Sequence, residues 1–424
     1  MTKINLKKSF TIYRENLDNN LDVILVPIHK SPVVCVDIAY RVGSKDEPFD
    51  KTGIAHLFEH LMFEGTKNNP KGEFDKLCAL AGGTNNAYTG FDITNYFMLL
   101  PSNQLELGLW LEADRMKNFK IIKESLQNQQ NVVIEEIKQT VEDQPYGLWR
   151  ELMSASAYSK DCSYSWEVQG TKEHVANVSI KDAELFRKTF YQPDNACLLL
   201  VGDIDLNTSK ELIQKHFSGI KKLHRTIERN KFSKSFLRHS AYQKFEDDVP
   251  TSAVFLGYHL DGFLKKQSYA GDIVANILGV GKSSRLWKRL VIEKQISNEV
   301  GAYIDKREHS SLLIIYAFAN TLEISCDMLA EEVNSTLKEF LRKSITDDEM
   351  QKAINQLSSQ MAFEIESLTG LADTIAQFAV FMDDPEKIYS NLDIYSKFSK
   401  SDINNYIQNI FSSGNSIRVD AVPS

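Results

Sequence analysis

The chain has 424 residues, of which 42% are hydrophobic and 25% are charged, and these are ordinary values for a globular protein with two or more domains. Its formal net charge of −8, without a long basic patch, argues against nucleic acid as a partner. No apolar stretch has the length of a signal peptide or a membrane span, and the five scattered cysteines indicate neither a disulfide framework nor a cysteine metal site, so the cytoplasm is the simplest location.

The first predicted elements are a strand and a helix. Residues 31–41 alternate in the way that a strand does. Residues 53–63 have helical periodicity and carry the motif H-x-x-E-H, formed by His56, Glu59 and His60. Residues three and four apart share one face of a helix, so both imidazoles can reach one ion while the carboxylate projects beside them.

Paired imidazoles on one helical face indicate a zinc site. Neutral imidazole is a preferred zinc ligand, but a catalytic zinc site needs three protein ligands and an open fourth position. A third ligand must therefore come from another part of the chain. The alternative is an ordinary helix whose two histidines are polar residues that flank the core positions Leu57, Phe58 and Leu61.

Residues 82–89, which read GGTNNAYT, allow two interpretations. The residues alone favour a turn made by Gly82 and Gly83 and decorated by Asn85 and Asn86. The second interpretation is an exposed edge strand that could pair with another chain.

A second helix is predicted over residues 129–141. Its apolar residues are spaced by three and four and define a buried stripe, which consists of Val132, Val133, Ile137 and Val141. Glu136 borders this stripe, whereas Glu135 falls among polar residues. A carboxylate on an apolar face is costly unless it is paired or coordinated, so Glu136 is the better candidate for the third ligand.

Together these residues resemble the M16 (pitrilysin/insulinase-like) family of metallopeptidases. In that family an inverted zinc motif is followed by a distant glutamate ligand, and here Glu136 lies 76 residues after His60 in the wording V-V-I-E-E-I. Residues 82–89 resemble the family's substrate-binding edge strand, and two further groups resemble the close of its first domain and a helix of its second. These groups are Tyr191, Pro193, Asn195, Val201, Gly202 and Asp203, and Ser283, Ser284, Arg285 and Leu286. The size points to the short subgroup that also contains mitochondrial processing peptidase subunits.

The resemblance implies an α+β protein of two homologous domains, each a mostly antiparallel sheet covered by helices, in the LuxS/MPP-like metallohydrolase fold. We expect an N-terminal zinc-bearing domain over residues 1–220, a linker over 221–248 and a C-terminal domain over 249–424. The linker carries basic residues, Arg225 among them, that are expected to be solvated, with an electrostatic substrate guide as the alternative.

An internal repeat agrees with two related domains. The strand and helix predicted at 31–63 have counterparts at 250–260 and 269–278. Aligning the two helices puts Asp272, Ala275 and Asn276 at the positions of the three motif residues. Two of the three chemical groups are absent there, so only the first domain is expected to hold a metal.

The resemblance also implies the chemistry. One zinc ion per chain is expected, held by His56, His60 and Glu136, with Glu59 removing a proton from the attacking water and returning it to the leaving amine. A short or unfolded peptide is expected to pair with the edge strand, whose backbone can add a strand of any sequence. The residues expected to bind this peptide are Gly82, Gly83, Thr84, Asn85, Asn86 and Ala87. Leader or presequence removal is one candidate role.

Two features depart from the family pattern. Enzymes of this type carry a second glutamate seven residues before the ligand, and here that position is Gln129, which keeps hydrogen bonding but loses a charge. An Arg/Tyr pair that holds the substrate is also missing, because our alignment puts Ile292 and Glu299 at its positions. The resemblance therefore implies a heterodimer whose homologous partner supplies the pair, with a homodimer less favoured. Tyr303 and Arg307 are nearby donors that would substitute if the alignment of this loop is shifted.

A non-catalytic scaffold or binding subunit of the same fold is the alternative function. The complete set of three ligand candidates and a carboxylate argues against this alternative.

Overall fold

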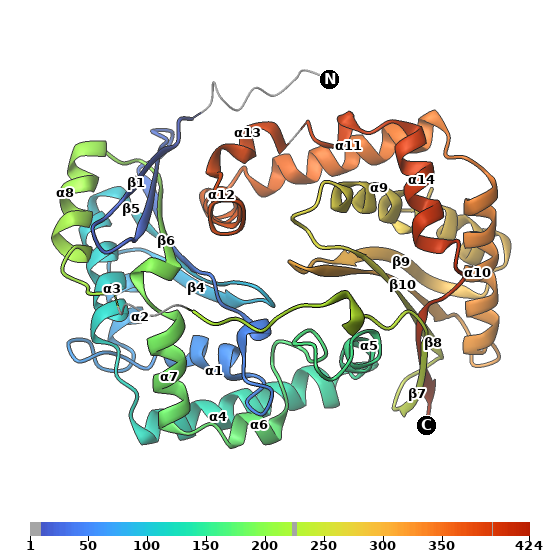
Figure 1. Ribbon diagram of the computed structural model, residues 1–424, viewed down its shortest axis with the longest axis horizontal. Coiled ribbons are helices and arrows are strands. Elements are labelled where there is room, and N and C mark those ends of the chain that lie inside the picture. The colour runs from blue at the N-terminus through green and yellow to red at the C-terminus, as the bar shows by residue number, and fades with distance from the viewer. Residues whose placement is uncertain (1–9, 223–226, 392) are drawn as a thin grey trace. The chain divides into compact units, whose positions relative to one another are not determined.

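The computed structural model describes residues 10–222, 227–391 and 393–424. It contains two sheets, a six-stranded one in the order β1-β2-β6-β3-β5-β4 and a five-stranded one in the order β7-β11-β8-β10-β9 (Figure 1). Among the described strands, β2 pairs with β6 and β7 pairs with β11 in parallel, and the other neighbours are antiparallel. The prediction of two mostly antiparallel sheets covered by helices is therefore confirmed.

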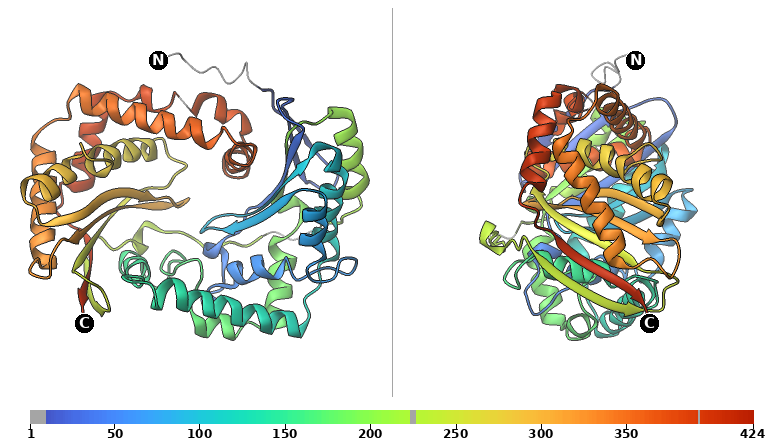
Figure 2. Two further views of the ribbon diagram at one scale, coloured as in Figure 1. Left: turned by 180° about the vertical axis from the view of Figure 1, so that it is seen from behind. Right: turned by 90° about the vertical axis from the view of Figure 1, so that its right-hand side faces the viewer.

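The strands of the first sheet are β1 (Tyr13–Asn16), β2 (Asp22–Pro27), β3 (Val33–Tyr40), β4 (Thr84–Thr89), β5 (Thr94–Pro101) and β6 (Ala196–Gly202). Those of the second sheet are β7 (Ala241–Asp247), β8 (Ala253–Asp261), β9 (Ser297–Asp305), β10 (Ser310–Ala319) and β11 (Ile417–Pro423). The right-hand view of Figure 2 shows β11, in red, running beside β7, with which it pairs in parallel.

The helices that precede β7 in the chain are α1 (Ile54–Leu61), α2 (Glu73–Leu80), α3 (Leu105–Asn118), α4 (Lys123–Ile137), α5 (Trp149–Ala157), α6 (Lys172–Ala176), α7 (Ile180–Phe190) and α8 (Leu206–Phe217). The later helices are α9 (Gln267–Gly279), α10 (Cys326–Arg342), α11 (Asp347–Glu364), α12 (Leu368–Met382), α13 (Ile388–Asn391) and α14 (Lys400–Phe411). No helix in the described part of the chain is long and apolar enough to cross a membrane.

The chain forms two compact units, and each unit is assembled from three separate segments. The first unit comprises Met1–Glu135, Val168–Asn230 and Met361–Leu392, and the second comprises Glu136–Glu167, Lys231–Gln360 and Asp393–Ser424. The domain bounds 1–220 and 249–424 stay a prediction. The segment 221–248 that we expected to be a linker contains β7, and Arg225 lies outside the described residues.

Helix α12 comes from late in the chain but packs on the first sheet, against β3 and β6 (Figure 1). Cys35 and Ala39 of β3 belong to the apolar cluster that contains α12 residues. Val36, on the opposite face of β3, lies close to Gly108 of α3. Both faces of β3 are thus covered by helices, which explains why nearly every residue of this strand is buried.

The helix predicted over 129–141 is formed by α4 and by a wider helical turn over Lys138–Glu142. Val133, Ile137 and Val141 are buried as expected, but Val132 is 48% exposed, so its place in the buried stripe is wrong. Adjacent residues of a helix point about 100° apart, and the packed face here includes Val133 rather than Val132.

Candidate metal centre

The apolar face of helix α1 packs into the interior of the first unit. Leu57, Phe58 and Leu61 are almost completely buried, and the Phe58 ring packs on the ring of Tyr191 with 4.3 Å between centroids. The left-hand view of Figure 2 shows α1 next to the edge strand β4. Because these apolar residues face the protein, the three motif side chains lie on the other side of the helix, each half-buried.

The first turn of α1 is capped by a buried carboxylate that the sequence pattern did not reveal. Glu47 accepts hydrogen bonds from the backbone N–H of Gly53 (2.9 Å) and of Ala55 (2.8 Å). Gly53 has a φ of 88°, and a Cβ there would lie 2.4 Å from the Gln169 carbonyl oxygen. Glu47 lies six residues before Gly53, outside the usual capping positions, so no local motif signals this role.

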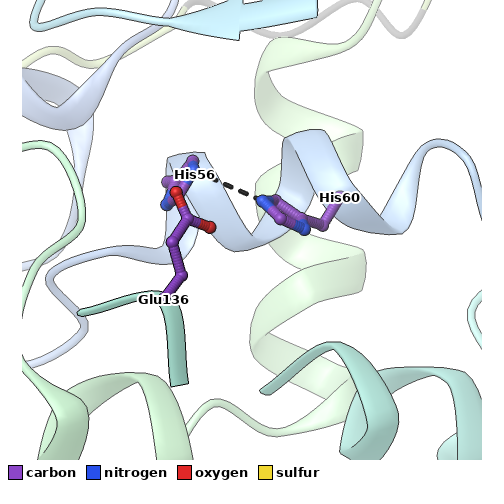
Figure 3. Close-up of side chains that lie close together, drawn as sticks. All are labelled: His56, His60 and Glu136. Carbon is purple, nitrogen blue, oxygen red and sulfur yellow. Dashed lines mark hydrogen bonds between the residues drawn. The ribbon is translucent and has the colours of Figure 1, made fainter. Parts of the chain in front are cut away.

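The predicted ligands come together. The Nε2 atoms of His56 and His60 are 3.3 Å apart, and Glu136 at the end of α4 directs its carboxylate at them (Figure 3). One ligand atom from each of the three residues lies within 4.8 Å of the others, and within the described residues this is the only group of three such side chains that could hold a metal ion. Glu135 is exposed and takes no part in this group.

The geometry of the group and the protonation state of His56 both fit zinc. Two nitrogen ligands of a tetrahedral zinc ion lie roughly 3.4 Å apart, close to the observed His56–His60 separation. Burial, with a smaller contribution from the charge of His60, lowers the pKa of His56 to about 4, so this imidazole is neutral near neutral pH. Neutral imidazole is the form that binds metal, and three protein ligands leave the fourth position for water.

Helix α4 is anchored by two consecutive glutamines. Gln130 Nε2 donates to the carbonyl oxygens of Val175 (2.8 Å) and Val178 (3.0 Å), which ties α4 to the segment before α7. Gln129 Nε2 donates to Glu64 Oε1 over 2.6 Å. The residue at the position of the family's second glutamate thus has a structural partner, two helical turns before Glu136.

The segment 82–89 contains both a turn and a strand. Gly82 has a φ of 78° and precedes β4, and a Cβ on Gly83 would lie 2.4 Å from Leu100 Cδ2. Residues 84–89 form β4, which is the last strand of the sheet and pairs with β5. The edge strand and the glycine turn, weighed above as alternatives, are therefore both present.

A second residue that the sequence did not single out contacts the motif. Thr89 Oγ1, at the end of β4, donates a hydrogen bond to Glu59 Oε2 over 2.5 Å. In the sequence Thr89 is the last residue of the segment GGTNNAYT, and no spacing rule connects it with a residue 30 positions earlier in the chain. The only available signal was its place in that segment.

The second unit offers no clamp at the expected positions. Ile292 is 60% exposed and Glu299 is an exposed residue of β9, and neither side chain has the guanidinium or phenol group of the expected pair. Arg307 is 1% exposed, and its guanidinium binds Asp305 (2.7 Å) and the Tyr164 carbonyl oxygen (2.8 Å). Arg307 is therefore held in the interior of the second unit.

Helix α9 of the second unit has other contacts at the positions of the motif. Asp272 accepts hydrogen bonds from Lys306 Nζ (3.0 Å) and from the Tyr395 hydroxyl (2.9 Å). Ala275 and Asn276 are buried. These residues hold α9 in place, and among the described residues the candidate metal group involves only α1 and α4.

Comparison with known proteins identifies the family. Residues 22–166 match the model described as insulinase (peptidase family M16), and residues 177–357 match the peptidase M16 inactive domain. A relative from Helicobacter pylori named zinc protease PqqE is 32% identical over 87% of this chain and 83% of its own length. The beta subunit of the mitochondrial-processing peptidase from Lentinula edodes is 23% identical over 85% of this chain and 79% of its own.

The fold agrees with these sequence matches. The crystal structure of a protease from Helicobacter pylori superposes with a TM-score of 0.90 at 29% identity and covers 98% of this chain and 100% of its own. The metal-ligand spacing, the two-sheet fold and these matches lead to one conclusion. The chain belongs to the M16 (insulinase) family of peptidases.

Proposed function

We propose that this chain is a zinc-dependent endopeptidase that hydrolyses short or unfolded peptides, with one zinc ion bound by His56, His60 and Glu136. The observation that carries this proposal is the convergence of two imidazoles and a carboxylate within 4.8 Å, beside the Glu59 carboxylate on the same helix. The name of the Helicobacter pylori relative, zinc protease PqqE, supports the choice of metal.

The residues of the proposed site have different roles. When bound, a zinc ion supplies a Lewis acid that polarises the scissile carbonyl and makes water a better nucleophile near neutral pH. Glu59 accepts the proton of the attacking water and delivers it to the leaving amine. The peptide adds to the edge strand β4, where Gly82, Gly83, Thr84, Asn85, Asn86 and Ala87 contact its backbone.

We further propose that the clamp for the substrate carbonyl comes from a homologous subunit, and that the chain works as the metal-bearing half of a heterodimer. The exposed Ile292 and Glu299, together with the buried Arg307, support this arrangement. Removal of a leader or presequence fits such a heterodimer. A cytoplasmic location is part of the proposal and is supported by five buried cysteine thiols without a disulfide.

Zinc content and hydrolysis test the catalytic assignment. The wild type and Glu59→Gln should each bind one zinc ion, but Glu59→Gln should lose hydrolysis by about 100-fold or more, because the proton acceptor is gone. Glu136→Gln should lose zinc, whereas Glu135→Gln, with the same charge change on the neighbouring residue, should keep both zinc and activity. A wild-type protein that binds no zinc, or a Glu136→Gln variant that keeps it, would contradict the assignment.

The heterodimer has a separate test. The purified chain should hydrolyse a fluorogenic peptide poorly until a homologous subunit that lacks H-x-x-E-H but carries the Arg/Tyr pair is added. High activity of a proven monomer or homodimer would refute this part alone and leave the metal assignment standing.

A further inference from the structure

The hydrogen bond between Thr89 and Glu59 connects two parts of the proposed active site. Thr89 is the last residue of β4, the strand proposed to receive the peptide, and Glu59 is the proposed base on α1. We propose that Thr89 is a positioning residue that sets the orientation of the Glu59 carboxylate relative to the peptide-binding strand. The inference deepens the proposed function and rests on it.

The alternation of β4 directs the Thr89 side chain towards α1. Its neighbour Tyr88 points to the opposite face of the sheet, where its hydroxyl donates to Asp373 Oδ1 of α12 over 2.5 Å. Successive side chains of a strand point to opposite faces of the sheet, so the Thr89 side chain faces helix α1. There its Oγ1 reaches Glu59 Oε2 over 2.5 Å.

The end of β4 is held firmly enough to act as a reference point. Thr89 pairs with Thr94 of β5, and Thr94 Oγ1 donates to the Val42 carbonyl oxygen over 2.9 Å. In the turn between the two strands, Asp92 forms a 2.9 Å ion pair with Lys45, and both side chains are only 6% exposed. A buried ion pair with a partner on another segment restricts the turn, so the position of Thr89 is defined by contacts on both sides.

The chemistry needs a carboxylate with a defined orientation. A general base must lie within hydrogen-bonding distance of the proton that it removes, and small errors in position are expensive. The threonine hydroxyl supplies a donor to one carboxylate oxygen, and the β-branch of threonine restricts its own χ1 rotation. The hydrogen bond therefore limits the rotation of the Glu59 carboxylate and links it to the strand along which the peptide lies.

Three variants of the full zinc-loaded chain, assayed together with the homologous subunit proposed above, test this role. Thr89→Val keeps the shape but removes the donor, and it should lower kcat by about ten- to a hundredfold with KM within about twofold and full zinc content. Thr89→Ser restores the hydroxyl and should return kcat to within about threefold of the wild type. Thr189→Val, which removes a hydroxyl that donates to the Leu185 carbonyl within α7, is the matched control and should behave as the wild type.

The outcomes separate positioning from a structural role. An unchanged kcat in Thr89→Val, a rise in KM alone, or a Thr89→Ser variant as slow as Thr89→Val would each overturn the proposal. A wild-type assembly that binds zinc but cleaves no peptide would instead count against the proposed function. In that case crystal structures of the zinc-loaded wild type and Thr89→Val decide: the Glu59 carboxylate should bind Thr89 in the first and turn away in the second, and an identical orientation in both would refute the role.

Discussion

Gln129 Nε2 donates a hydrogen bond to Glu64 Oε1 over 2.6 Å, and the same Glu64 oxygen lies 2.6 Å from Lys71 Nζ. The Glu64 side chain is only 5% exposed, so it depends on these two donors. A glutamate at position 129 would bring a second carboxylate to the same place. Glutamine at position 129 therefore suits this site, because it can donate a hydrogen bond to Glu64 and a glutamate could not.

The variant Gln129→Glu should destabilise the protein by about 1–3 kcal/mol at pH 8, because a donor is replaced by a like charge. Two adjacent carboxylates raise one pKa in the folded state, so this loss of stability should grow as the pH rises from 5 to 8. Urea unfolding at both pH values measures it. Gln127→Glu, an exposed position of the same helix, is the control, and equal stability of Gln129→Glu at pH 5 and 8 would count against the pairing.

Asp37 lies in the middle of β3 and is fully buried. Burial, and then the charge of Asp373, raise the pKa of Asp37 well above the ordinary value. A hydrogen bond from Asn95 lowers this pKa, and the charge of Glu112 raises it by a smaller amount. Asn95 Nδ2 donates to Asp37 Oδ2 over 3.0 Å, and among the described residues Asp37 Oδ1 and Asn95 Oδ1 have no partner. A neutral Asp37 would be less costly to bury than an ionised one.

Asp37→Asn should therefore become more stable than the wild type as the pH rises. A carboxyl group whose pKa is raised by folding lowers stability progressively as the pH rises from its ordinary value, near 3.9, to its folded value. The variant carries no such group, because its amide stays neutral at every pH of the experiment. The difference in unfolding free energy should be small near pH 4 and grow by up to about 1.4 kcal/mol per pH unit.

Unfolding of wild type and Asp37→Asn between pH 4 and 8 provides the measurement. Asp50→Asn, at an exposed position, is the matched control and should show no such trend. A difference that stays constant with pH would mean that Asp37 is ionised in the folded protein.

Phe58 positions helix α1, so its truncation should affect both the stability of the protein and its affinity for zinc. Its side chain is completely buried and packs on Tyr191 and Phe119. Phe58→Ala should cost about 3–5 kcal/mol and weaken zinc binding, because α1 loses its packing on these aromatic rings. Phe363→Ala, at a residue that is 73% exposed, should change stability by less than about 0.5 kcal/mol. Unfolding and zinc titration of both variants check this, and a Phe58→Ala variant with wild-type zinc affinity would show that α1 is fixed by other contacts.

Arg307 should be a structural residue of the second unit. Its guanidinium is bound by Asp305 and lies 3.7 Å from Glu167. Burial raises the pKa of Glu167 above its ordinary value, and the positive charge of Arg307 offsets part of this rise. Arg307→Met leaves these acids without their cation and should cost about 3–5 kcal/mol, with zinc content unchanged. Arg342→Met, at an exposed position, is the control. A variant of Arg307 with normal stability but without hydrolysis would instead make Arg307 the substrate clamp.

The candidate metal ligands could be predicted because each depends on a short-range pattern. The spacing of His56 and His60 on a helix places both imidazoles on one side, and the apolar stripe on α4 separates Glu136 from Glu135. The internal repeat likewise predicts two related sheets. The expectation that Val132 is buried is wrong. The spacing of apolar residues predicts a stripe on the helix, but it does not determine which residues at the margin of the stripe pack against the core.

The contacts around the ligands could not be predicted, since they join segments far apart in the chain. Glu47 caps α1, Thr89 binds Glu59 and Gln129 binds Glu64, and none of these pairs has a periodic spacing. The packing of α12 on β3 and β6 joins segments that are even farther apart in the sequence, because it brings residues 368–382 to the first sheet.

By itself the sequence determined the identity of the candidate metal ligands, the helices that carry them and the two-sheet architecture. Helix and strand periodicity and ligand chemistry are properties of neighbouring residues, so they can be read without coordinates. Only the tertiary structure decided which distant residues orient those side chains. It also decided which helix covers each apolar face. These choices depend on the packing of whole elements against one another, where a shift of one residue changes every partner.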